Sequence, residues 1–201
     1  TAQWNLGLAA TVLQHWEVAQ TAWQYLKHKK SKYRLIPIQL QSQGFQEIVW
    51  AKPLDAVRAK IESIPHPFSK RRYGEVVLHD GKSEGKLIVQ QGPMDVYPEI
   101  QPLERSFFDT YSVLLRTDKI ADINLLDQLC FNADLGFDNW SNTNELHLNK
   151  QRQASPEYYT KQFFEVNPSP TEQSYTVIGI AAKQKEAVIE VLETWRIISL
   201  A

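Results

Sequence analysis

Apolar residues in the first 26 positions recur with the spacing of an α-helix. One stripe consists of Leu6, Leu8, Ala9, Val12 and Leu13, and a second of Trp16, Ala19, Ala22, Trp23 and Leu26. Because residues three and four apart share a helix face, each stripe predicts a helix. A short turn at residues 15–17 would join the two into a hairpin. Small residues would let the helices approach closely, as in a tetratricopeptide unit or in an ordinary αα-hairpin.

From Leu35 the apolar residues follow the alternation of β-strands. Strands are predicted at residues 35–40, 46–50, 60–64, 74–79 and 86–89, with a turn or short helix at 51–59. Asp80-Gly81 is a turn signal, so the strand at 86–89 is expected to pair with the strand at 74–79. The connection at 80–85 would then project from the sheet. Residues 93–102 are predicted to be irregular.

The last hundred residues carry a strand and helix pattern. Strands are predicted at 110–116, 145–148, 163–166, 175–181 and 197–200, and helices from 119 to about 135 and at 183–196. The order from Thr110 is interpreted as β-α-β-β-α-β, the ferredoxin-like pattern. The predicted fold class is α+β. The predicted regions are a helical hairpin at 1–34, a β-rich region at 35–105 and a ferredoxin-like region at 106–201.

Composition narrows the function classes. The 201 residues include 22 Lys and Arg and 23 Asp and Glu, for a net charge of −1. This balance argues against nucleic acid as a partner, because nucleic-acid binding normally needs a basic face. No apolar run is long enough to span a membrane and no signal peptide is visible. The single cysteine, Cys130, lies in an apolar helical run, where we expect a buried structural thiol. A lone cysteine fits a reducing compartment, so a cytoplasmic location is expected.

Two basic runs are candidates for contact with a partner. Lys29, Lys30, Lys32 and Arg34 follow the second predicted helix, and Lys70, Arg71, Arg72 and Tyr73 precede a predicted strand. The first run also suits a solvated helix end, whose cations complement the helix dipole. The second combines arginine with an aromatic residue, as interfaces often do, although a plain solvated loop has the same composition. Trp140, in a polar segment, suggests either an exposed interface anchor or a lid over the core.

The polar residues Glu75, His79, Asp80 and Glu84 are the best candidates for chemistry. On one strand, Glu75 and His79 would share a face but stand about 13 Å apart, too far to bind one metal ion. A solvated hairpin end, with Asp80 shaping the turn, explains the same residues. This exposed end at 80–85, with Asp80 and Glu84, is a further candidate for contact with a partner. His66, between two prolines, is interpreted as a rigid loop residue. The sequence contains no local motif for a metalloprotease, hydrolase, kinase or dehydrogenase, and no cofactor is expected.

Several segments together resemble a family of bacterial proteins in which a tetratricopeptide-like hairpin precedes an α+β body. They are residues 4–11, 22–23, 47–50, 55–59, 61–65, 72–81, 138–141 and 179–195. The segment Gly74-Glu75-Val76-Val77-Leu78-His79-Asp80-Gly81 is the most specific. The sequence departs from the family at 27–44, where a lysine-rich run replaces an acidic, Gly- and Pro-rich loop. It also has residues 142–149 where the family has cysteines. The resemblance carries no catalytic assignment.

These observations favour a protein-binding module. By analogy with other small α+β proteins, the resemblance implies an immunity protein that neutralises a secreted bacterial toxin by direct contact. Two alternatives stay open: a metal-dependent or acid–base enzyme that uses residues 75–84, and a regulatory domain that binds a small molecule. The chain begins at Thr1 with residues that look like the middle of a helical array, so we expect it to continue a longer polypeptide.

Overall fold

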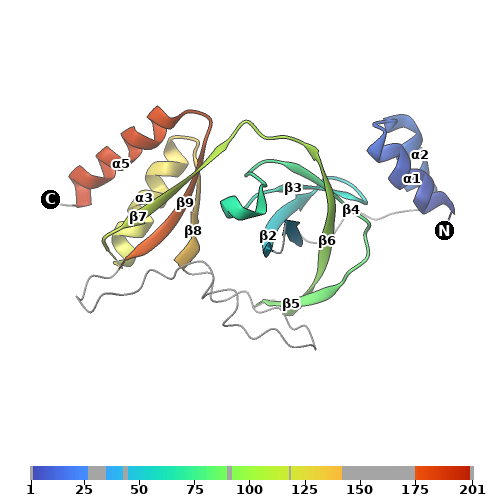
Figure 1. Ribbon diagram of the computed structural model, residues 1–201, viewed down its shortest axis with the longest axis horizontal. Coiled ribbons are helices and arrows are strands. Elements are labelled where there is room, and N and C mark those ends of the chain that lie inside the picture. Colours follow the sequence, from blue (N-terminus) through green and yellow to red (C-terminus); the bar gives the residue numbers. More distant parts are fainter. Residues whose placement is uncertain are drawn as a thin grey trace.

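Three groups of elements follow one another along the molecule (Figure 1). A helical hairpin lies at one end, a β-barrel in the middle, and a layer of three strands and two helices at the other end. The structure is a computed structural model and describes residues 2–26, 35–42, 45–89, 92–117, 119–141 and 175–199. The fold class is α+β, as predicted.

The barrel consists of five strands and one attached strand. These are β1 (Ile36–Ser42), β2 (Phe45–Pro53), β3 (Arg58–Ile61), β4 (Val76–His79), β5 (Gly85–Val89) and β6 (Gly92–Glu104). Neighbouring strands run antiparallel in the order β1-β2-β3-β4-β6, and the parallel pairing of Ile38 with Tyr97 closes the ring. The attached strand β5 pairs with the first five residues of β6. A short 3-10 helix, η1 (Pro67–Ser69), lies between β3 and β4.

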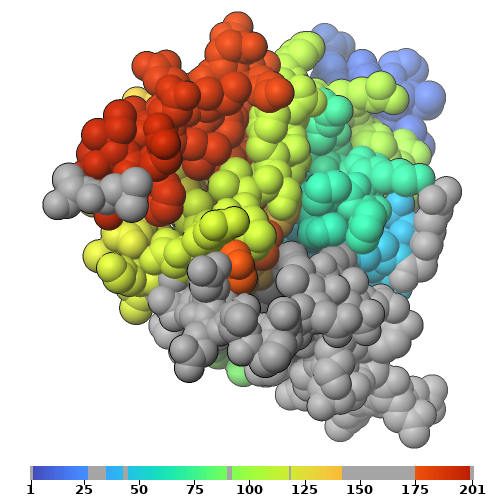
Figure 2. Space-filling model, turned by 60° about the vertical axis from the view of Figure 1, so that its left-hand side comes forward, coloured from blue at the N-terminus to red at the C-terminus, as the bar shows by residue number. Residues whose placement is uncertain are grey.

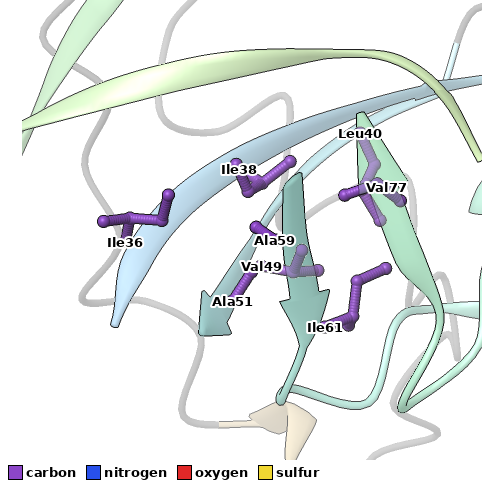
Figure 3. Close-up of a cluster of buried hydrophobic side chains, with 8 residues drawn as sticks. All are labelled: Ile36, Ile38, Leu40, Val49, Ala51, Ala59, Ile61 and Val77. Carbon is purple, nitrogen blue, oxygen red and sulfur yellow. The ribbon is translucent and has the colours of Figure 1, made fainter. Parts of the chain in front are cut away.

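Alternate residues of the strands fill the interior of the barrel (Figure 3). The buried cluster consists of Ile36, Ile38, Leu40, Val49, Ala51, Ala59, Ile61 and Val77. Side chains on a strand point alternately to its two faces, so Ile36, Ile38 and Leu40 of β1 enter the same core. The small side chains of Ala51 on β2 and Ala59 on β3 share this interior with the larger isoleucines and leucine.

The C-terminal layer is a three-stranded antiparallel sheet with helices on one face. Its elements are β7 (Asp109–Leu115), α3 (Ile120–Asn132), β8 (Gly136–Asn139), β9 (Thr176–Ala182) and α5 (Lys185–Ser199), and the strand order is β7-β9-β8. Leu126 and Cys130 of α3 and Val188 and Val191 of α5 pack on Ile178 and other buried strand residues. The opposite face meets the barrel, where Ala181 contacts a cluster with Ile64 and Trp140. In Figure 2 the β6–β7 segment runs between this layer and the barrel.

The helical hairpin docks on the outside of the barrel through two tryptophans. Helix α1 (Ala2–Val12) and helix α2 (Trp16–Tyr25) bring the rings of Trp4 and Trp23 together edge to face, with centroids 5.1 Å apart. Trp23 covers Gly7, where a Cβ would come within 2.6 Å of the ring, and Trp4 covers Gly81 at the same distance. Glycine at both positions therefore permits the close approach of the helices to each other and to the barrel.

Two strand predictions are wrong for a common reason. The predicted pairing of 74–79 with 86–89 does not exist, because β4 pairs with β3 and β6 while β5 pairs with β6. The partner in both cases is β6, which runs through the segment predicted to be irregular. Two of its three prolines lie at irregular places: Pro98 is at the short parallel pairing, and Pro102 is beside a bulge opposite Val77. The third, Pro93, pairs with Ile88 of the attached strand β5.

Smaller differences concern the ends of elements. The strand predicted at 60–64 is β3 and ends at Ile61, and residues 51–53 extend β2 instead of forming a turn or helix. Residues 136–139, predicted as a loop, form β8, and residues 197–199, predicted as a strand, continue α5. The predicted strands at 145–148 and 163–166 lie outside the described residues. The ferredoxin-like order and the three-region division therefore stay predictions.

Candidate functional site

Most of the second basic run is engaged in contacts within the chain. The guanidinium Nε of Arg71 lies 2.5 Å from Oε1 of Glu99, whose side chain is buried. Arg72 pairs with Asp109 at 2.6 Å, and the ring of Tyr73 packs edge to face on Phe108. Arg72 and Tyr73 thus join the barrel to the start of β7 and have less side chain to offer a partner.

Of the remaining basic residues predicted to contact a partner, the structure describes Lys70 but not the first basic run. Lys70 is exposed at the end of η1, in a left-handed backbone conformation with φ 57°. Lys29, Lys30, Lys32 and Arg34 lie outside the described residues, so contact through this first run stays a prediction.

The polar residues of 75–84 do not assemble into one site. Glu75, which immediately precedes β4, and His79, the last residue of β4, are buried, whereas Glu84 is exposed. Nδ1 of His79 accepts a hydrogen bond from the Gly81 N–H, and the imidazole ring lies 5.1 Å from that of Tyr97. Asp80 accepts from the Lys82 N–H at 2.8 Å, the turn-shaping role that the sequence suggested. Burial raises the pKa of Glu75, which favours its neutral form.

Trp140 is a buried residue, 7% exposed, and covers the core as a lid instead of standing in solvent. Its indole N–H donates to the Ile64 carbonyl at 3.0 Å. Its ring fills the space over Gly179, where a Cβ would approach the ring to 2.5 Å. The interface-anchor interpretation of Trp140 is therefore wrong for this arrangement.

The outer face of the hairpin is an exposed apolar surface that the sequence interpretation missed. Leu6 and Leu13 of α1 are 47% and 64% exposed, and Val18 and Tyr25 of α2 are 44% and 70% exposed. Exposed Ala9 lies between the two leucines. Both leucines belong to the apolar stripe that predicted the first helix, and the sequence did not show that they stay exposed. A signal was present in the sequence, because α1 carries no charged residue and only three polar side chains, Gln3, Asn5 and Thr11, whereas the solvent-facing side of a helix is normally charged and polar.

The four large residues share one side of the hairpin. An α-helix turns 100° per residue, so Leu6 and Leu13 lie on the side of α1 opposite Trp4 and flank the buried Ala10. Since α1 directs Gly7 toward α2 and Trp4 toward the barrel, the side with the leucines faces away from the barrel.

The same periodicity places Val18, Thr21 and Tyr25 of α2 on the side opposite Trp23, with Val18 beside the buried Ala22. Leu13 and Val18 lie at the turn of the hairpin, while Leu6 and Tyr25 lie at its open end. We call the surface of Leu6, Ala9, Leu13, Val18, Thr21 and Tyr25 the outer face. Residues 2–26 contain a single carboxylate, Glu17, and neither lysine nor arginine.

A second notable cluster lies between the barrel and the C-terminal layer. Glu47 of β2 accepts hydrogen bonds from the His66 N–H at both carboxylate oxygens, 3.1 and 3.2 Å away. Asp138 of β8 accepts from the Ile64 N–H at 3.2 Å. Burial raises the pKa of Glu47 to about 7, raises that of Asp138, and lowers that of His66. Only His66 had attracted notice in the sequence, as a rigid loop residue.

Within the described residues, no group of three or more His, Cys, Asp and Glu side chains is placed to hold a metal ion. In the same part of the chain, no helix is both long and apolar enough to cross a bilayer. Comparison of the chain with protein-family models, curated proteins and solved structures finds no match, so the functional assignment depends on the surface and the chemistry of the chain itself.

Proposed function

We propose that the chain is a protein-binding module and that the outer face of its hairpin binds a charge-poor helical surface of a partner protein. The carrying observation is the combination of four large, exposed apolar side chains with a helix pair that has one charged residue. Interface cores are depleted in charge and enriched in aromatic and large apolar residues, whereas ordinary solvent-facing helices are rich in Lys and Glu.

The shape of the outer face favours a helix as the occupant. Leu6 and Leu13 are ridges separated by the small Ala9, and Val18 and Tyr25 are ridges separated by Thr21. Side chains of a facing helix at the same spacing fit into the grooves between such ridges. A partner with charged residues at those positions would have to desolvate them without a counter-charge, so the face selects against such a partner.

The size of the outer face sets the expected affinity. The four large side chains expose on the order of 450 Å², close to the largest apolar patch of a typical monomer, and such patches are often functional. Interfaces that bury less than about 1,200 Å² in total belong to the weak or transient class. A contact made by this face alone is therefore expected to have a micromolar Kd, and tighter binding would require additional surface from the rest of the molecule.

Two more specific forms of the proposal rest on the resemblance of the sequence. In the first, the hairpin is the end of a tetratricopeptide-like array, and the outer face receives a neighbouring helical hairpin. In the second, the partner is a secreted bacterial toxin, and the chain is the immunity protein that neutralises it. In both forms of the proposal, the outer face binds the same kind of surface, one that is helical and poor in charge. The two other interpretations, an enzyme that uses 75–84 and a small-molecule regulatory domain, gain no support from the arrangement of side chains.

The experiment compares the wild type with the double variant Leu6→Gln/Leu13→Gln. Glutamine keeps the helix propensity but removes the apolar contact. A matched control is Ile120→Gln/Phe131→Gln, which changes two apolar residues of α3 that are 74% and 81% exposed. Tagged proteins are isolated from cells of the source organism, bound proteins are quantified by mass spectrometry, and the recovered partner is purified and titrated against each variant by calorimetry.

The proposal predicts one partner that binds the wild type and the control equally and the double variant at least tenfold more weakly. Each leucine is half exposed before binding, so burying the remainder contributes about 1 kcal/mol per residue, or about 30-fold for the two. Circular dichroism should show the same helix content in all three proteins. Equal binding of the double variant and the wild type, or loss of binding in the control alone, would refute the proposal.

A further inference from the structure

One loop holds the barrel and the C-terminal layer together. It comprises residues 62–66, and both backbone groups of Ile64 bond to side chains of the layer: the N–H donates to Asp138 and the carbonyl accepts from Trp140. The Ile64 side chain packs against Gly136 and Ala181, where an added Cβ at Gly136 would lie 3.4 Å from it. Hydrogen bonds and side-chain packing thus hold Ile64 against the C-terminal layer.

The barrel bonds to the same loop at His66, two residues further along the chain. Both oxygens of Glu47 accept from the His66 N–H, and the Ser69 hydroxyl donates to the His66 carbonyl at 2.8 Å. The amides of residues 64 and 66 therefore point to two different carboxyl groups, one from each half of the molecule. Among the described residues, none of the ion pairs includes Glu47 or Asp138. When both carboxyl groups ionise, the two like charges repel each other, and within the described residues neither charge has an ion-pair partner.

We propose that Glu47 and Asp138, with the loop 62–66 between them, form a pH-sensitive latch that joins the barrel to the C-terminal layer and loosens when the carboxyl groups ionise. The inference goes beyond the proposed function and does not depend on the outer face of the hairpin. Its basis is the geometry: two carboxyl groups from opposite halves accept from amides two residues apart, and the titratable ring of His66 lies 5.4 Å from that of Trp140.

The direction of the pH effect follows from proton linkage. Burial raises the pKa of Glu47 from 4.5 to about 7, and the nearby Asp138 carboxyl adds to the rise against the hydrogen bonds from the His66 N–H. The closed latch therefore holds a proton that the open latch releases, and closure is favoured below about pH 4.5 and weakened as pH rises through 7. Each unit of pKa corresponds to a factor of ten in the opening equilibrium.

Several titratable groups at the junction determine how the effect is measured. Tyr73 packs in the same cluster as Ile64, with Glu62 and Asp134 near it. Glu47 comes from β2, His66 from the loop, Asp138 from β8, and Asp127 of α3 raises the pKa of Asp138 further. Burial lowers the pKa of His66, so its protonation in the open form opposes closure below about pH 6.5. The difference between the wild type and Glu47→Gln at each pH removes this opposing contribution, because His66 is present in both proteins.

The test is amide hydrogen exchange of the Ile64 and His66 N–H groups between pH 5 and pH 8, with each rate divided by its intrinsic value. A pKa shift from 4.5 to about 7 sets an upper limit of roughly 70-fold on the rise in opening, and about tenfold is expected because Glu47 keeps some access to water. Glu47→Gln should remove most of this rise, and Asp138→Asn should reduce it. Glu84→Gln, at an exposed position, should leave it unchanged.

The Val49 amide, in the β1–β2 ladder, reports on opening of the barrel itself and should show no such rise. The latch is refuted if opening at Ile64 and His66 does not change between pH 5 and pH 8 in the wild type. It is equally refuted if Glu47→Gln, or Asp138→Asn where the first variant does not fold, shows the full wild-type rise.

Discussion

Replacement of Gly179 by alanine should destabilise the protein more than any neighbouring glycine replacement in a strand. Gly179 lies in the middle of β9, paired with Ser112 on one side and Asp138 on the other. An added Cβ would lie 2.5 Å from Cε2 and Cζ2 of Trp140 and 2.9 Å from its Nε1. The ring cannot retreat without giving up its hydrogen bond to the Ile64 carbonyl.

The magnitude can be worked from these contacts. Overpacking a filled core costs about 1–3 kcal/mol, and loss of the indole hydrogen bond adds about 1 kcal/mol. Alanine is favoured over glycine in a strand interior by about 0.5–1 kcal/mol, which acts in the opposite direction. The free energy of unfolding of Gly179→Ala should therefore fall by about 2 kcal/mol.

Urea unfolding followed by far-ultraviolet circular dichroism measures the change. Gly85→Ala is the matched control, because Gly85 also lies in a strand and an added Cβ there meets nothing within 4 Å. This control should be neutral or slightly stabilising. In a Trp140→Phe background the clashing atoms are absent, so Gly179→Ala should cost less than about 1 kcal/mol. Equal effects at the two glycines, or an undiminished cost in the phenylalanine background, would refute the reasoning.

Other consequences of the structure can be checked in the same unfolding and labelling assays. Burial, with a contribution from the Asp127 carboxylate, raises the pKa of the Cys130 thiol to about 12, so a thiol reagent at pH 8 should label it only in urea; rapid labelling of the folded protein would contradict this. Arg71→Ala should cost about 3 kcal/mol because it leaves a carboxylate that is 3% exposed without its cation. Arg72→Ala breaks a pair whose side chains are 49% and 55% exposed and should cost less than about 1 kcal/mol. Similar costs for the two arginines would show that their burial does not set their contribution.

The local elements could largely be predicted from the sequence, whereas the pairing of strands could not. The apolar spacing of 16, 19, 22 and 23 predicted α2, in which Ala19, Ala22 and Trp23 are buried but Trp16 is exposed. Alternation predicted β1, β2, β4, β5 and β9. The closure of the barrel depends on β6, a long strand whose three prolines imitate an irregular segment. It is recognisable as a strand only because different neighbours pair with different parts of it.

Neither the outer face of the hairpin nor the junction of Glu47 and Asp138 could be predicted from the sequence, and the reasons differ. Leu6 and Leu13 have the same spacing as buried residues, so only the position of the barrel shows which side of α1 is covered. Glu47 and Asp138 are 91 positions apart and meet through the loop around Ile64, and no local motif marks a contact made between two layers. By contrast, Arg71 and Arg72 looked like interface residues because their partners Glu99 and Asp109 are also distant in sequence.

The central claim is that the chain binds its partner through the uncharged outer face of the hairpin and not through its basic runs. The most direct measurement is the calorimetric Kd of the complex in 50 mM and in 500 mM NaCl. Salt screens charged contacts but hardly affects apolar ones. Binding by the outer face predicts a Kd that changes less than about threefold between the two conditions and weakens at least tenfold in Leu6→Gln/Leu13→Gln. A Kd that rises more than about tenfold with salt and ignores the leucine variant would contradict the account, and would place the contact on the basic runs.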